Sequence, residues 1–120
     1  MLFRSRPGSG ENFGNNSQLG PGFYVTPDYH TASEFAFVAT DNYGGRSIVL
    51  SVCAFGFSSM SHEEVPSIAW WNDIRTASYL SYDYLTAPID GMQGIQIKFN
   101  PGPLVRGQVI VYAITFPGGN

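Results

Sequence analysis

A chain of 120 residues with 43% hydrophobic content can bury one core and has little room for a second, so we expect a single domain over residues 1–120. Charged residues make up 12% of the sequence and the net charge is −3, which argues against the basic surface that nucleic-acid binding requires. No apolar run predicts a membrane span and the first residues lack the apolar core of a signal peptide, which leaves a secreted effector and a cytoplasmic protein both open.

The first half of the chain predicts a strand, a polar loop, a second strand and a helix. A short strand is expected at residues 2–4 and a Gly/Asn/Ser-rich loop at residues 7–18. Thr26 and Pro27 predict the cap and first position of a helix over about residues 27–40. Gly20 and Gly22 can take backbone angles closed to other residues and let a ligand approach beside the ring of Tyr24. Residues 20–36 are therefore interpreted as a ligand-binding turn that leads into a helix.

The second half of the chain is mostly β-forming. A strand is predicted at residues 46–57, a capping box and helical turn at residues 61–64, and a second helix at about residues 67–80. Further strands are expected at residues 82–88, 94–99 and 108–116, with a turn at residues 100–103 between the last two. Helix and strand alternate too irregularly for a doubly wound parallel sheet, so the fold class predicted is α+β.

Three segments together resemble the motifs of the ADP-ribosyltransferase superfamily, whose members cleave NAD. Leu2-Phe3-Arg4-Ser5 is similar to its first strand, which carries His or Arg, and Gly22-Phe23-Tyr24-Val25-Thr26 with the helix around Ala32-Ser33-Glu34-Phe35-Ala36 is similar to its second motif. In Gln93-Gly94-Ile95-Gln96-Ile97-Lys98-Phe99, a glutamine would occupy the place of the catalytic glutamate, because no Glu follows Glu64. The resemblance covers roughly residues 2–104.

The resemblance implies a β-rich split sheet with two or three short helices. It also implies an NAD glycohydrolase or ADP-ribosyltransferase with a toxin or effector role, with NAD as substrate and no metal. The partners implied are NAD and either a protein acceptor or an immunity or inhibitor protein. Because a neutral amide cannot act as a carboxylate base, hydrolysis by water is favoured over modification of a protein.

The resemblance further assigns roles to individual residues. Arg4 would bind phosphate or a ribose hydroxyl, the Ser5 backbone the carboxamide, and Tyr24 would stack on the nicotinamide ring. Gln96, or alternatively Gln93, would hydrogen-bond the ribose hydroxyls. The candidate set is catalytic Gln96, Arg4 and Tyr24, with binding residues Ser5, Gly22, Tyr24, Thr26 and Gln93.

Other interpretations remain open for the chain and for these residues. A catalytically inactive module with the same fold would bind NAD, ADP-ribose or a protein partner, and a small β-rich domain would bind sugar through exposed aromatic rings. Tyr24 could be a core residue, and Gln96 could face solvent on the sheet surface. His30 and His62 lack the paired carboxylates at ligand spacing that a metal site would need.

Overall fold

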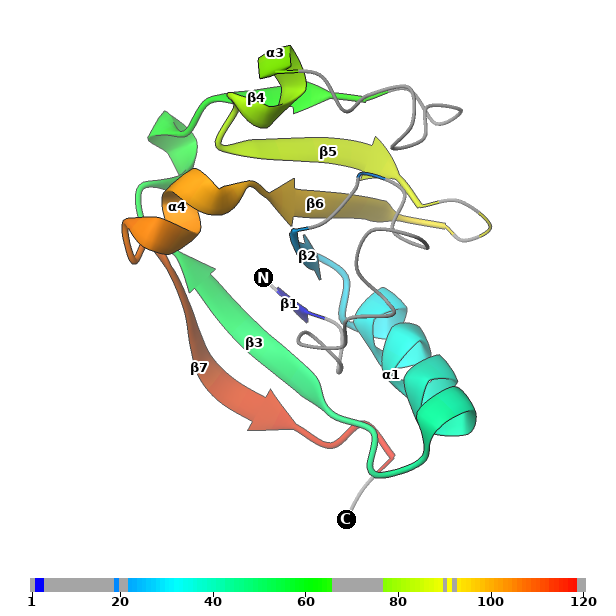
Figure 1. Ribbon diagram of the computed structural model, residues 1–120. Helices are drawn as coiled ribbons and strands as arrows, with labels where there is room; N and C mark the ends of the chain where they lie inside the picture. Colours follow the sequence, from blue (N-terminus) through cyan, green and yellow to red (C-terminus); the bar gives the residue numbers. More distant parts are fainter. Residues whose placement is uncertain are drawn as a thin grey trace.

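The computed structural model describes residues 2–3, 19, 22–65, 77–89, 91 and 93–118. These residues form an α+β fold, which confirms the predicted class (Figure 1). In chain order the elements are β1 (Leu2–Phe3), β2 (Phe23–Thr26), α1 (Tyr29–Tyr43), β3 (Val49–Ala54), the 3-10 helix η2 (Phe57–Ser59), β4 (His62–Glu64), α3 (Ala77–Leu80), β5 (Tyr84–Pro88), β6 (Ile95–Phe99), α4 (Pro101–Val105) and β7 (Val109–Thr115).

The described strands form a seven-stranded sheet in the order β4-β5-β6-β2-β1-β3-β7. Strands β4 and β5 are parallel, and the other neighbours are antiparallel. Figure 1 shows β5 and β6 crossing the upper part of the molecule, while β3 and β7 run obliquely below them. Strands β1, β2 and β6, which lie in the three sequence motifs, are thus neighbours in the middle of the sheet.

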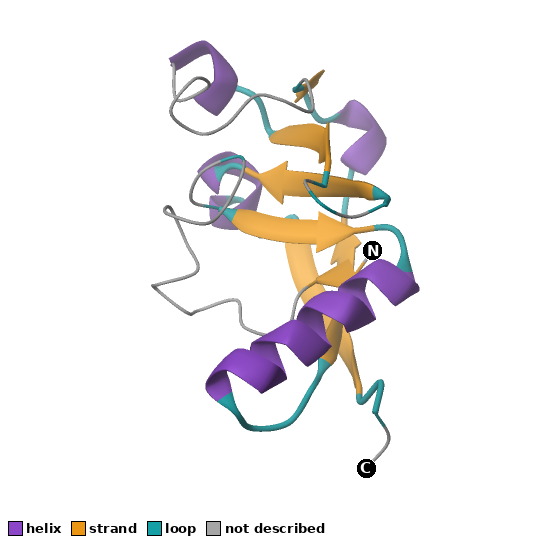
Figure 2. Ribbon diagram, turned by 90° about the vertical axis from the view of Figure 1, so that its right-hand side faces the viewer, coloured by secondary structure: helices purple, strands orange, loops and turns teal. Residues whose placement is uncertain are grey.

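Helix α1 packs against the central strands, as Figure 2 shows from the side. Its residues Ala32 and Ala36 are fully buried and form a cluster with Val49 of β3, because alanines let the helix approach the sheet closely. The larger core lies around the middle of the sheet and contains Val25, Val52, Leu85, Ile97 and Phe99. Among the described helices, none has both the length and the apolar character to cross a membrane.

The start of α1 differs from the prediction. The helix begins at Tyr29 rather than at Pro27, and its cap is Asp28 rather than Thr26. The Asp28 carboxylate accepts hydrogen bonds from the backbone N–H of Thr31 at 3.1 Å and from its hydroxyl at 2.5 Å. These bonds hold the pKa of Asp28 below its ordinary value of 3.8. A carboxylate satisfies the free N–H groups of a helix start better than the hydroxyl of Thr26, which instead accepts from the Asp28 N–H at 3.3 Å.

We expect the substitution Asp28→Ala to lower the melting temperature by roughly 3–6 °C at pH 7, because α1 loses its cap. The pKa of this carboxyl is lowered in the folded state, so its contribution is present above the unfolded pKa and disappears as the pH falls through the folded value. Thermal unfolding at pH 7 and pH 3 measures both effects, and Asp28→Asn, which keeps a capping oxygen, is the control. Equal melting temperatures for wild type and Asp28→Ala at pH 7 would show that the cap contributes nothing.

Two further local predictions are wrong. Residues 61–64 contain strand β4 rather than a helical turn, because the backbone of Ser61 and the Asp83 side chain bond to each other and align β4 with β5. Residues 101–105 form helix α4 rather than a plain turn, with Pro101 in its first turn. At residues 61–64, a contact with a distant residue overrides the local helical signal. At residues 101–105, a favourable helix start overrides the local turn signal.

The strands otherwise match their predicted places, with ends that differ by a few residues. The predicted loop at residues 7–18 lies outside the described residues, as does most of the helix predicted at residues 67–80, of which α3 is the described end.

Strand β7 forms one edge of the sheet and is mostly exposed. Most of its exposed side chains are apolar, namely Ile110, Val111, Tyr112 and Ile114. The pairing with β3 shifts register between Ser51 and Val52, which leaves Tyr112 as an additional residue on β7. Such a bulge bends an edge strand and weakens its suitability for pairing with another chain.

Candidate functional site

A small cavity lies where β2, β6 and α1 meet. In the β2–β6 pair, Tyr24 is opposite Lys98 and Val25 is opposite Ile97. Because side chains alternate along a strand, Tyr24 of β2 shares a sheet face with Gln96 and Lys98 of β6. The cavity has a volume of about 20 Å³ and is lined by Tyr24, Val25, Thr26, Phe35, Ile89 and Gln96. The structure therefore brings together three of the candidate residues, namely Tyr24, Thr26 and Gln96.

Tyr24 is held in a fixed position at this cavity. Its side chain is only 4% exposed, and its hydroxyl accepts a hydrogen bond from the backbone N–H of Leu19 at 2.9 Å. The ring is therefore buried in the protein and its hydroxyl is hydrogen-bonded to the backbone. Tyr24 can contact a ligand only through the part of its ring that lines the cavity.

The two candidate glutamines occupy different environments. Gln96 is half-buried at the cavity, and its amide nitrogen donates to the carbonyl oxygen of Pro88 at 3.1 Å. Gln93 is exposed in the connection between β5 and β6 and is not among the cavity residues. Of the two glutamines, Gln96 lines the cavity with Tyr24 and Gln93 does not.

Gly22 has a role that differs from the predicted one. It does not have a positive φ angle; what it provides is a close approach to Lys98. A Cβ atom at position 22 would lie 2.6 Å from Cε of Lys98, closer than any side chain can be accommodated without movement. Glycine at this position is therefore explained by packing of the protein against itself.

Lys98 is a residue that the sequence reasoning missed. It is the only lysine of the chain, and it is completely buried on the same sheet face as Tyr24. Its Nζ donates a hydrogen bond to Oδ1 of Asn100, whose own amide donates to the carbonyls of Tyr79 at 3.1 Å and Tyr82 at 2.7 Å. Burial lowers the pKa of Lys98 to about 8. The sequence carried no signal for its burial, because the alternation of β6 places Lys98 on the same face as Gln96, where polar side chains are ordinarily exposed.

Phe35 was also missed as a site residue. The sequence places it at helical spacing with the buried alanines of α1, which suggests only a core position. In the structure it is half-buried and lines the cavity together with Tyr24. Two aromatic rings and one amide thus surround the same small space.

Arg4 and Ser5 lie outside the described residues. The strand that precedes them, β1, is described, and its last residue Phe3 pairs with Val25 of β2. The first motif therefore runs beside the second, although the positions of the Arg4 and Ser5 side chains are not part of the described structure.

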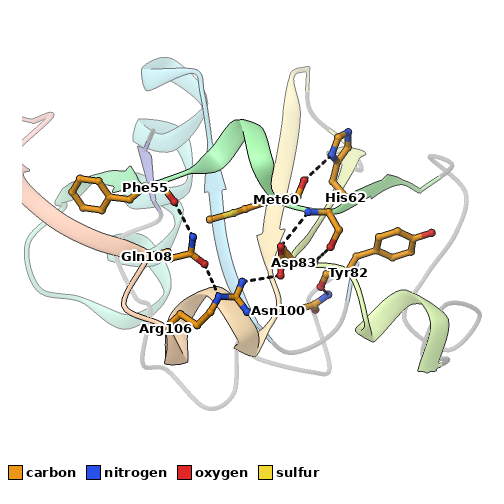
Figure 3. Close-up of polar contacts among 9 residues, drawn as sticks. Phe55, Met60, His62, Tyr82, Asp83, Asn100, Arg106 and Gln108 are labelled. Carbon is orange, nitrogen blue, oxygen red and sulfur yellow. Dashed lines mark hydrogen bonds and ion pairs between the residues drawn. The ribbon is translucent and has the colours of Figure 1, made fainter.

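A second polar network lies away from the cavity and has a structural role (Figure 3). The Arg106 guanidinium donates to Asp83 at 2.9 Å and to Gln108 at 2.7 Å, and Gln108 donates to the Phe55 carbonyl at 3.1 Å. The bond from Arg106 holds the pKa of Asp83 below its ordinary value. The network connects α4 to β5 and to the segment after β3, and its groups are occupied by one another.

The described residues contain no group of three or more His, Cys, Asp or Glu side chains that could hold a metal ion. We compared the chain with models of protein families, with curated protein sequences and with solved structures, and found no match in any of the three.

Proposed function

We propose that the chain is an NAD-cleaving enzyme with an ADP-ribosyltransferase-like split sheet, which acts as an NAD glycohydrolase or as a weak transferase. The observation that supports this most directly is the adjacency of β1, β2 and β6, which places Tyr24 and Gln96 at one cavity. These strands lie in the three segments that resemble the superfamily motifs, and residues this far apart in sequence meet only through the fold.

The reaction needs little acid catalysis. The bond between the ribose and nicotinamide breaks with its electron pair leaving on nicotinamide, which departs as a neutral molecule. The ribose becomes a cation of the oxocarbenium type, and a water molecule adds to it and loses a proton to solvent, which yields ADP-ribose. The protein therefore has to position the two rings and stabilise the cation rather than supply a proton.

The residues at the cavity fit these tasks. Tyr24, fixed through its hydroxyl, would pack against the nicotinamide ring, with Phe35 at the same cavity. The amide of Gln96 would hydrogen-bond the ribose hydroxyls beside the reacting carbon. Since this amide carries no charge, it activates a protein acceptor poorly, and water is the preferred acceptor.

The cavity itself, at about 20 Å³, has room for a water molecule and not for a nicotinamide ring. Binding must therefore open it. The half-buried side chains of Phe35 and Gln96 are the parts able to move, because Gln96 would exchange its bond to Pro88 for one to the substrate. The neutral amide of Gln96 at the place of a catalytic glutamate also supports a second candidate function, a catalytically inactive module of this fold that binds NAD, ADP-ribose or a protein partner.

The test is turnover of NAD by the purified chain, with nicotinamide release followed by chromatography and NAD binding followed by calorimetry. Release that is proportional to protein concentration is the expected result. Saturable binding without release would replace the enzyme with the inactive module. If the chain neither releases nicotinamide nor binds NAD, both functions are overturned and only the resemblance of the sequence motifs is left.

A further inference from the structure

An open groove lies on the sheet face opposite the Tyr24 cavity. Its volume is about 660 Å³, and it runs over β4, β5 and β6. Ile95 and Ile97 of β6, which line it, alternate with Gln96 and therefore point to the other face of the strand. This volume falls within the range of ordinary small-molecule sites, which are mostly apolar with a few polar groups.

Three stacked rings form part of the groove lining. The Tyr84 ring lies parallel to the Phe57 ring, with centroids 4.6 Å apart, and parallel to the His62 ring, with centroids 5.0 Å apart. Burial raises the pKa of Tyr84, so its hydroxyl stays neutral. Together with Ile95, which is 46% exposed, the stack offers flat aromatic and aliphatic surface to a ligand ring.

One carboxylate of the groove has no partner within the described part of the chain. Glu64 is exposed and shares a face of β4 with His62, two residues earlier. No described hydrogen bond or ion pair engages its carboxylate. The adjacent Glu63, by contrast, accepts hydrogen bonds from the Tyr82 hydroxyl at 3.2 Å and from the Glu64 N–H at 3.1 Å. The groove thus combines an apolar floor with one negative charge at its rim.

We propose that this groove binds a small molecule made of a planar aromatic ring with a cationic amidinium or ammonium group. The ring packs on Ile95 and the aromatic stack, and the cation pairs with Glu64. The imidazole of His62 can accept or donate one further hydrogen bond, since its Nδ1 has only a long contact of 3.5 Å to the Met60 carbonyl. This site does not depend on the proposed NAD cleavage, because it lies on the opposite face of β6.

The experiment is an NMR titration of the full chain with benzamidine, an aromatic cation, and with benzamide, its neutral analogue. For a ligand of about nine non-hydrogen atoms we expect a dissociation constant on the order of 1 mM. Shifts should concentrate on β4, β5 and β6, and benzamide should bind several-fold more weakly.

Glu64→Gln and Glu63→Gln are the matched variants, because each removes one negative charge from neighbouring exposed or partly exposed positions of β4. We expect Glu64→Gln to weaken benzamidine about threefold to tenfold and to remove its advantage over benzamide, while Glu63→Gln changes affinity less than about twofold. Equal effects of the two variants would show general attraction to an acidic chain and overturn the site. Shifts outside the three strands, or equal binding of the two ligands to wild type, would overturn it as well.

Discussion

Replacing Gln96 by alanine is expected to lower the rate of nicotinamide release by about 100-fold to 1,000-fold. The amide lies at the cavity with Tyr24, and under the proposed function its loss would remove a hydrogen bond to the ribose that strengthens as the sugar becomes cationic. Such a bond is worth more in the transition state than in the bound substrate, so kcat should fall more than KM rises. The measurement is steady-state nicotinamide release over a range of NAD concentrations.

Gln93→Ala is the matched control for this experiment. It removes the same side chain three positions earlier, from an exposed site that does not line the cavity. We expect its kcat and KM to stay within about twofold of wild type. If Gln93→Ala loses activity and Gln96→Ala keeps it, the third motif has been assigned to the wrong glutamine. Melting curves of both variants separate loss of activity from loss of fold.

Lys98→Ala, in the middle of the sheet, should be strongly destabilising, with a loss of about 3–5 kcal/mol in the free energy of unfolding. The substitution removes a completely buried side chain that fills the space beside Gly22, and it leaves Oδ1 of Asn100 without the ammonium donor. Lys98→Met, which keeps most of the buried chain, should lose less. Urea unfolding at pH 7 measures both, and equal midpoints for wild type and Lys98→Ala would contradict the packing described.

The same lysine makes a prediction about pH. Its folded pKa of about 8 lies below the ordinary value of 10.5, so between these values the unfolded chain binds more protons than the folded one. The free energy of unfolding should therefore rise with pH across this interval, with a slope of at most about 1.4 kcal/mol per pH unit. The raised pKa values of Tyr82 and Tyr84 oppose this only above about pH 10, so pH 8 to 9.5 is the interval to measure. Lys98→Met should abolish the slope.

The sequence predicted the elements better than it predicted their ends or their partners. Runs of β-branched and aromatic residues located β3, β5, β6 and β7, because such residues favour strands whatever those strands pair with. The capping-box pattern at residues 61–64 failed because Ser61 bonds Asp83, a partner 22 positions away that no local pattern can show. The helix cap moved from Thr26 to Asp28 for the opposite reason, since two acceptable local caps compete and geometry decides between them.

The candidate site was predictable only in part. The motif segments pointed to Tyr24, Thr26 and Gln96, and these do meet at one cavity. Phe35 was missed because periodicity reports that a residue is buried and not which space it fills. Lys98 was missed because a lysine in an alternating strand is ordinarily exposed. The groove over β4, β5 and β6 was not foreseen at all, because it depends on three rings that stack across η2, β4 and β5.

The pairing of β2 with β6 also determines the order in which the two sites can form. In this pair Val25 meets Ile97, which lies far along the chain. The groove is lined by residues that are closer in sequence, between positions 57 and 97, and its strands β5 and β6 form a local hairpin. Closing the longer loop costs more chain entropy, and non-local pairing is the slow step in folding of β-rich domains. The groove is therefore expected to be complete early in refolding and the cavity late, so a kinetic intermediate would bind at the groove before it could bind NAD.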